Sequence, residues 1–227
     1  QLIEDSTRTI LSSQHHSSMH IHVSSIPHAT IYVAEGLNTI TPDELSEALA
    51  SLPQWRRELA LNFKFQQGRI ECAFSYLLLC RALRESYGIT EQPLFEIGEH
   101  GKPTLLFTQA SPAPPIHFNL SHCKTAIACV VSEIPVGIDV ERMGRYRESL
   151  ARHVFNDQEF AEVTTSPDPQ IPFTRLWTQK EAIVKLTGRG IDDNLQELLF
   201  KYNNVLLHTE EHVQQDYVLT VAVWNEE

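Results

Sequence analysis

The longest regular pattern in the sequence is a run of apolar residues at helical spacing between about Gln66 and Ser86. Its apolar positions, three or four residues apart, are Ile70, Ala73, Phe74, Leu77, Leu78 and Leu83. Gly88 follows shortly afterwards and is a natural stop for a helix. The chain is therefore predicted to contain one long helix in its N-terminal half.

The other regular patterns are shorter and alternate between strand and helix. Strand-like runs cover residues 21–26, 29–34, 116–121, 125–132, 136–141 and 217–224. Helical patterns cover residues 147–163 and 172–187, and a capping box of Thr41 and Glu44 starts a further helix. Because strands and helices mix without the strict βαβ rhythm of a doubly wound sheet, the predicted class is α+β.

Two lobes are predicted, residues 19–134 and 135–227, divided by the turn that follows Glu133. The 227 residues, of which 42% are hydrophobic, are enough to bury a proper core in this arrangement. Residues 1–18 are interpreted as a leader or mobile arm, because Met19 precedes the first convincing strand. This stretch lacks the charged-then-apolar order of a secretory signal.

Charge and cysteine usage narrow the class of protein. A formal net charge of −11 argues against binding to a nucleic-acid backbone, which needs a dense cationic surface. No run of about 18 apolar residues is present, so no membrane-spanning segment is expected. The four cysteines form no C-x-x-C pair and stand in apolar stretches, at Cys72, Cys80, Cys123 and Cys129. Buried free thiols are the favoured interpretation, and they fit a cytoplasmic location.

The segment VGIDVE places two carboxylates two residues apart in an apolar strand pattern. Side chains alternate along a strand, so Asp139 and Glu141 share one face, opposite Ile138 and Val140. Two like charges in a half-buried setting need a cation between them, unless one of them is protonated. A hard divalent ion such as Mg²⁺ would satisfy both. A strand end with two solvated acids explains the same pattern and stays open at this point.

Two further segments carry groups that suit a phosphate. FNLSHCK combines the hydroxyl of Ser121 and the imidazole of His122 with turn amides, although a plain polar turn is equally compatible. Lys102 lies between a glycine and a proline, so its backbone is restrained and its amine can be presented to a ligand. By itself this second segment is simply a turn.

The segment LWTQKEAIVKLTGRG, residues 176–190, predicts a helix whose Trp177, Glu181 and Lys185 share one face. Glu181 and Lys185 would form an ordinary surface ion pair if that face met solvent. If the face instead met Asp139 and Glu141, three carboxylates would converge on one cation. The helix alone does not decide between these alternatives.

Five motifs occur in the order and approximate spacing of one known family. They are GKP (101–103), FNLSH (118–122), VGIDVE (136–141), FNDQE (155–159) and LWTQKEAIVKLTGRG (176–190). Through them the chain resembles the 4′-phosphopantetheinyl transferases, in particular the larger, monomeric surfactin-synthetase-activating type. The resemblance is firm over residues 63–190. It implies two similar α/β lobes related by a pseudo-twofold axis, with coenzyme A in the cleft between them.

The resemblance also implies an activity. Such an enzyme is cytoplasmic and Mg²⁺-dependent, and it transfers 4′-phosphopantetheine from coenzyme A to a serine of an apo carrier protein, giving the holo carrier and 3′,5′-ADP. By motif, Asp139, Glu141 and Glu181 would hold Mg²⁺. Glu181 would take the serine proton, directly or through a metal-bound water. Lys185 would stabilise charge on the phosphate under attack.

Coenzyme A binding is implied for residues spread over the chain: Arg69, Lys102, Pro103, Ser121, His122, Asp139, Lys180 and Lys185. Arg69 would meet the 3′-phosphate, with Arg56, Arg57 or Lys64 as candidates to assist it. Cys123 stands where the family commonly has a serine, which leaves a hydroxyl contact there in doubt. Glu159 matches a family acid that we interpret as structural or accessory.

Two rival functions are compatible with the residues alone. A Mg²⁺-dependent phosphohydrolase or nucleotidyl transferase would use the same three acids on another substrate. A non-catalytic binding module would keep the fold without the chemistry, but it would be expected to have lost part of the acid set or Lys185. Residues 142–154 are the candidate surface for the carrier protein, and a solvated basic helix is the plain alternative for them.

Overall fold

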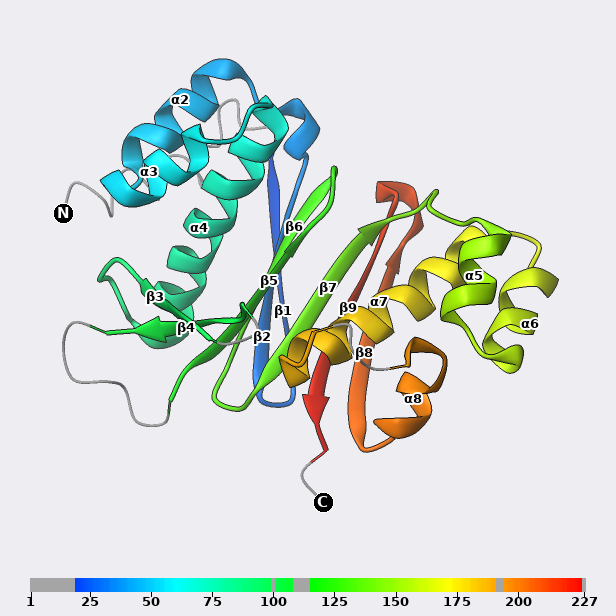
Figure 1. Cartoon of the computed structure of the whole chain (residues 1–227). Coiled ribbons are helices and arrows are strands. Elements are labelled where there is room, and N and C mark those ends of the chain that lie inside the picture. The colour runs from blue at the N-terminus through cyan, green and yellow to red at the C-terminus, as the bar shows by residue number, and fades with distance from the viewer. Residues whose placement is uncertain (1–18, 99–100, 108–114, 191–193, 226–227) are drawn as a thin grey trace.

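The computed structural model describes residues 19–98, 101–107, 115–190 and 194–225, so the predicted leader at 1–18 lies outside the described residues. The fold mixes helices with three antiparallel sheets, which agrees with the mixed class expected from the sequence. Figure 1 shows two main sheets side by side, each with one long helix on its outer side. None of the helices in the described ranges is long and apolar enough to cross a membrane.

The first main sheet has four strands in the order β1-β2-β6-β5. Its strands are β1 (His20–Ile26), β2 (Ala29–Glu35), β5 (His117–His122) and β6 (Ala126–Ser132). The long helix predicted from the apolar pattern is α4 (Gln66–Tyr87), and it ends at Gly88 in the left-handed conformation. It packs on this sheet, and α2 (Pro42–Ser51) and α3 (Gln54–Leu61) pack against α4 (Figure 1).

The second main sheet has three strands in the order β7-β9-β8. They are β7 (Val136–Arg142), β8 (Val205–His212) and β9 (Tyr217–Trp224). Helix α7 (Gln170–Thr187) lies across this sheet in Figure 1, and three shorter helices surround it. These are α5 (Glu148–Val154), α6 (Asp157–Thr165) and α8 (Leu198–Lys201).

Three short 3₁₀ segments and a small hairpin complete the part of the chain that the structure describes. The 3₁₀ segments are Leu37–Thr39, Leu195–Glu197 and Val213–Gln215, and the hairpin strands are β3 (Leu94–Ile97) and β4 (Pro103–Leu106). The sequence patterns did not predict the hairpin or β8. Most side chains of β8 are exposed or half-buried, and it lacks the clean alternation that identifies a strand from sequence.

Several local predictions are confirmed. Thr41 caps α2, because its hydroxyl accepts a hydrogen bond from the Glu44 amide and the Glu44 carboxylate accepts one from the Thr41 amide. The strand predicted at 217–224 is β9, with the same bounds. All four cysteines are free, and three of them are buried.

The two main sheets pack their inner faces against each other. Alternate residues of β2 and β6 form one hydrophobic cluster with residues of β7 and β9, including Ile31, Val130, Ile138 and Val221. The alternation of β7 then turns Asp139 and Glu141 toward the opposite face, where α7 lies. This face contains the site described below.

Strands β5 and β7 lie side by side where the two sheets meet, but no backbone ladder joins them in the described residues. Side chains of β5 take that role: Asn119 Oδ1 accepts from the Ile138 amide at 2.9 Å, and Ser121 Oγ accepts from the Val140 amide at 3.1 Å. Buried edge amides need such partners. The FNLSH motif therefore holds β7 in place.

Helix α7 approaches β7 very closely at Gly137. A Cβ atom built on Gly137 would lie 2.1 Å from the Ala182 carbonyl oxygen and 2.5 Å from the Leu186 amide nitrogen, so only glycine fits there. Nearby, the hydroxyls of Thr178 on α7 and Thr220 on β9 share a buried hydrogen bond of 2.8 Å. These contacts determine which face of α7 meets the acids of β7.

Candidate active site

Asp139 is the most buried acid of the predicted set, with 4% of its surface exposed. Its Oδ1 atom accepts hydrogen bonds from Lys185 Nζ at 2.8 Å and from Ser121 Oγ at 2.9 Å. Its Oδ2 atom is buried and has no hydrogen-bond partner among the described residues. A buried carboxylate oxygen without a partner costs free energy, so this atom is suited to a ligand that brings positive charge.

Glu141 and Glu181 are half-buried acids whose charges interact with that of Asp139. Burial raises the pKa of the Glu141 carboxyl, and the negative charge of Asp139 raises it further. Burial and the charge of Asp139 raise the pKa of Glu181 in the same way, with a further contribution from Glu141. Glu181 on α7 therefore lies within the range of charge interaction with the two acids of β7.

The carboxylates of Asp139, Glu141 and Glu181 have the charge and the oxygen ligands that suit a divalent cation, but they are not arranged as a complete metal-binding site. Within the described ranges, no group of three or more His, Cys, Asp or Glu side chains has the arrangement of a metal site. Lys185 supplies positive charge at Asp139 instead. The unpartnered Oδ2 of Asp139, and the raised pKa values of its two neighbours, are what a hard cation with oxygen ligands would relieve.

Ser121 links β5, β7 and α7 through one hydroxyl group. Its Oγ donates to Asp139, accepts from the Val140 amide and lies 2.9 Å from Lys185 Nζ. The prediction from sequence placed Ser121 near a phosphate. The structure places it beside the lysine that was expected to meet the same phosphate.

Ser121→Ala is expected to lower the free energy of unfolding by about 1–3 kcal/mol, because the Val140 amide would remain buried without an acceptor. Urea unfolding of the purified variant measures this. Thr164→Val, which removes an exposed hydroxyl on α6, is the matched control and should change stability by less than about 0.5 kcal/mol. Equal stability of Ser121→Ala and the control would contradict the bridging role.

His122 ends β5 and contacts α4, the helix that carries Arg69, and within the described residues neither side chain has a recorded contact with Asp139, Glu141 or Glu181. His122 Nδ1 is 3.4 Å from the Glu71 carboxylate, and Arg69 Nε donates to the Phe63 carbonyl at 2.9 Å. His122 is exposed and Arg69 is half-buried. Both side chains keep nitrogen atoms that these contacts do not use, so the placement is compatible with binding a phosphate.

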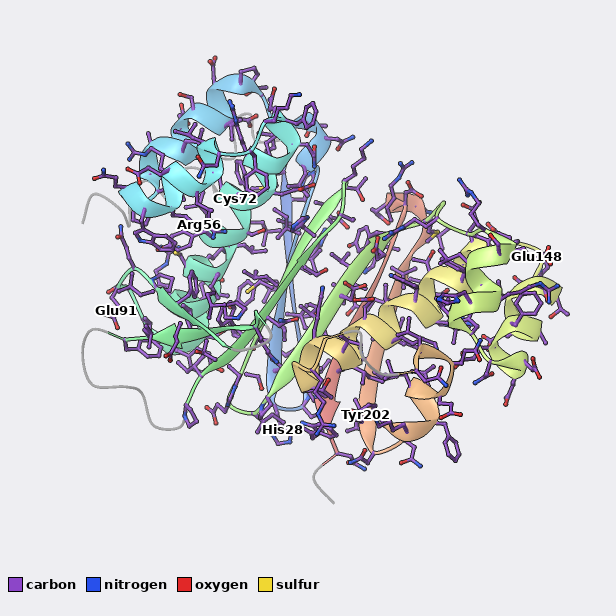
Figure 2. The ribbon with its side chains drawn as sticks, in the orientation of Figure 1. His28, Arg56, Cys72, Glu91, Glu148 and Tyr202 are labelled. Carbon is purple, nitrogen blue, oxygen red and sulfur yellow. The ribbon has the colours of Figure 1, made fainter. Side chains whose placement is uncertain are left out.

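Two arginines that were candidates to assist Arg69 are engaged in the N-terminal helices. Arg56 donates to the Cys72 carbonyl at 3.0 Å, and Figure 2 shows the two residues close together between α3 and α4. Arg57 donates to carbonyls at the C-terminal end of α2, which are those of Leu49, Ala50 and Leu52. Both arginines therefore stabilise packing, and Lys64 is the exposed one of the three candidates.

Lys102 and Pro103 stand at the start of β4, but the lysine amine is directed at α7. Its Nζ atom contacts three carbonyl oxygens, those of Lys185, Leu186 and Val136. Burial lowers the pKa of this lysine. The expectation that its ammonium flanks a nucleotide does not match this position, because an ammonium has three donors and all three are used.

Lys180 was expected to contact coenzyme A, and its position overturns that expectation. Only 1% of the residue is exposed, and its ammonium lies 2.8 Å from the Glu159 carboxylate. It also donates to the Leu195 carbonyl. Burial lowers the pKa of Lys180, while the hydrogen bond and charge of Glu159 raise it. The pair instead ties α6 and the segment after α7 to the helix that carries Glu181.

One residue of the site was not found from the sequence. Arg145 follows β7, forms an ion pair with Glu141, and places its guanidinium 5.7 Å from the centre of the Trp177 ring. An arginine four residues after an acid is common on surfaces, so the pattern carried no signal of its own. Trp177 also stacks on Phe173.

Comparison with known proteins identifies the family of this chain. The model of the 4′-phosphopantetheinyl transferase superfamily matches residues 135–222, which contain the three acids and Lys185. The chain is 37% identical over 159 residues to the 4′-phosphopantetheinyl transferase AcpT of Salmonella typhimurium, a match that covers 67% of this chain and 71% of that protein.

Two relatives from Bacillus give similar matches. A 4′-phosphopantetheinyl transferase of Bacillus subtilis is 29% identical over 156 residues, or 67% of each chain. The 4′-phosphopantetheinyl transferase psf-1 of Bacillus pumilus is 32% identical over 143 residues, which is 62% of this chain and 59% of the relative. The chain thus spans 59 to 71% of the length of these three relatives. It belongs to the 4′-phosphopantetheinyl transferase superfamily.

Proposed function

We propose that this transferase holds Mg²⁺ with Asp139, Glu141 and Glu181 and brings coenzyme A to that ion. The observation that carries the proposal is the buried Oδ2 atom of Asp139, which lacks a partner among the described residues and lies beside two carboxyls of raised pKa. When bound, Mg²⁺ would neutralise charge on the pyrophosphate of coenzyme A and act as a Lewis acid. The three acids would then be ligands and not solvated surface groups.

Lys185 is proposed to stabilise negative charge on the phosphate under attack. Its ammonium has three donors, of which one goes to Asp139 and one to Ser121, so a third remains for a phosphate oxygen. Its side chain is partly exposed, in contrast to the buried Lys180. Ser121 and His122 are proposed to complete the phosphate contacts from β5, and Arg69 those to the 3′-phosphate.

Glu181 is proposed as the base for the carrier serine. The serine oxygen forms a bond to the phosphorus on the pantetheine side of the pyrophosphate, the bond from that phosphorus to the bridging oxygen breaks, and 3′,5′-ADP leaves. The proton of the serine hydroxyl passes to Glu181. A carboxylate that binds Mg²⁺ is a weak base by itself, so Glu181 would act through its position beside the serine hydroxyl, directly or through a water.

The two lobes, 19–134 and 135–227, are proposed to be related by a pseudo-twofold axis, with coenzyme A between them. Each lobe pairs an antiparallel sheet with one long helix, α4 or α7, and each of these helices ends at a left-handed glycine, Gly88 or Gly188. The proposed ligands come from both lobes. The site would therefore form only where β5 and β7 meet.

The carrier protein is proposed to dock beside α7, with residues 142–154 as its contact surface. This segment carries Arg142, Arg145, Arg147 and Arg152, all exposed or half-buried, on a chain of net charge −11. The enzyme is further proposed to be a monomer and to work in the cytoplasm. The four free cysteines support a reducing compartment.

The assay for this function is direct. Incubation of the protein with coenzyme A, Mg²⁺ and a panel of apo carrier proteins should add one phosphopantetheine mass to a carrier serine, as detected by mass spectrometry. Omission of Mg²⁺ in the presence of a chelator should remove the activity. Failure on every carrier, with a known transferase active in the same assay, would refute the proposal, and phosphate release from nucleotides without a carrier would favour a phosphohydrolase.

A further inference from the structure

Lys102 reaches from the β3–β4 hairpin to a point where two other elements meet. Its ammonium donates to the carbonyl oxygens of Lys185 at 2.7 Å, Leu186 at 3.1 Å and Val136 at 3.3 Å. Two of these carbonyls belong to the last turn of α7, and the third belongs to the first residue of β7. One side chain of the N-terminal half thus binds the helix and the strand that carry the three acids.

A cation stabilises the last turn of a helix more than its middle turns. Carbonyls there lack intrahelical partners, and the helix dipole gives that end a partial negative charge. Helix α7 stops at Gly188, whose missing side chain would first meet the Cδ atom of Lys102 at 3.5 Å. The lysine stem therefore passes over this glycine, and its amine closes the end of the helix.

The consequence for the site lies in Lys185. The backbone carbonyl of Lys185 accepts the shortest of the three bonds from Lys102, while its ammonium lies 2.8 Å from Asp139. The close approach at Gly137 already brings the end of α7 against β7. Lys102 adds a restraint on the rotation of the final turn, which controls where the Lys185 side chain points.

We propose that Lys102 is a positioning residue that fixes the last turn of α7, and hence Lys185, instead of binding coenzyme A through its ammonium. The role in catalysis rests on the proposed function, whereas the restraint on α7 does not. The side chain of Lys102 would then act on the rate of transfer and not on the affinity for coenzyme A.

Two measurements on Lys102→Met test this. Hydrogen exchange of the ligand-free protein should become about tenfold faster in the amides of residues 184–188, the effect of losing a charge-assisted hydrogen bond. In the transfer assay, kcat should fall about tenfold while KM for coenzyme A changes less than twofold. Lys102→Arg keeps a cationic donor, so it should recover part of the exchange protection of residues 184–188 and part of kcat. Lys201→Met on α8 is the charge-matched control and should match wild type.

Each other outcome overturns the inference. A rise in KM for coenzyme A with unchanged kcat would make Lys102 a direct ligand. Unchanged exchange in residues 184–188 would remove the restraint on α7. If Lys102→Met lowers Tm but leaves kcat of the folded enzyme unchanged, the contacts of Lys102 contribute only to stability and not to positioning Lys185. If wild type transfers nothing to any carrier, the proposed function fails on its own, and the exchange experiment still decides whether Lys102 holds the helix.

Discussion

Asp139→Asn is expected to reduce phosphopantetheine transfer by about a hundredfold or more while the protein stays folded. Asparagine keeps the size of the side chain and an oxygen that can accept from Lys185 and Ser121. It removes the charge of the buried carboxylate, whose free Oδ2 is the proposed contact to Mg²⁺. The variant also removes the repulsion that Asp139 exerts on Glu141 and Glu181, so no large loss of stability is expected.

Three measurements separate the metal role from a structural one. The transfer rate should fall, Mg²⁺ binding in the presence of coenzyme A should weaken at least tenfold by calorimetry, and the urea unfolding curve should stay close to that of wild type. Asp43→Asn, on the exposed side of α2, removes the same charge elsewhere and should leave all three unchanged. Normal turnover by Asp139→Asn would show that the metal assignment is wrong.

Lys180→Met is expected to lower the free energy of unfolding by about 3–5 kcal/mol, a larger loss than that expected for Ser121→Ala. Methionine would leave Glu159 as a buried carboxylate without its cation, and the Leu195 carbonyl without its donor. A buried charge that loses its partner costs far more than the intact pair contributes. Urea unfolding of the purified variant measures the loss.

The double variant Lys180→Met with Glu159→Gln tests the cause. Glutamine is neutral but keeps an oxygen that can accept from the Asn156 amide, so the capping box of α6 survives. The second substitution should therefore restore a large part of the lost stability. If Lys180→Met lowers the free energy of unfolding by less than about 1 kcal/mol and raises KM for coenzyme A, Lys180 is a coenzyme A ligand and not a structural residue.

Local sequence patterns were sufficient for much of the fold. The apolar repeat identified α4, the capping box identified the start of α2, and clean alternation identified β9, because each of these signals is contained within a few neighbouring residues. Strand β8 and the β3–β4 hairpin were not found. Their side chains are largely exposed, so their conformation depends on pairing with a partner strand and not on a local pattern.

The candidate site also has features that the sequence predicted and features that it did not. Motif spacing brought Asp139, Glu141, Glu181 and Lys185 into one prediction, and the structure shows charge interactions among these four residues. Both Lys180 and Lys185 were expected to contact coenzyme A, and only Lys185 was expected to share a helix face with Glu181. Lys185 lies over the β7 acids, whereas Lys180 turns into the core, because the helix rotates the two side chains to different faces.

By itself, the sequence determined the class of fold and the family and singled out the proposed acid set, since residue type and spacing carry that information. Only the tertiary structure decided the partners of Lys102, Arg56 and Arg57, whose amines and guanidinium groups bind carbonyls far along the chain or in neighbouring helices. A long cationic side chain can reach either a phosphate or a helix end with similar chemistry. For Lys102, the close packing of α7 on Gly137 places the helix end within its reach, and no local pattern records that packing.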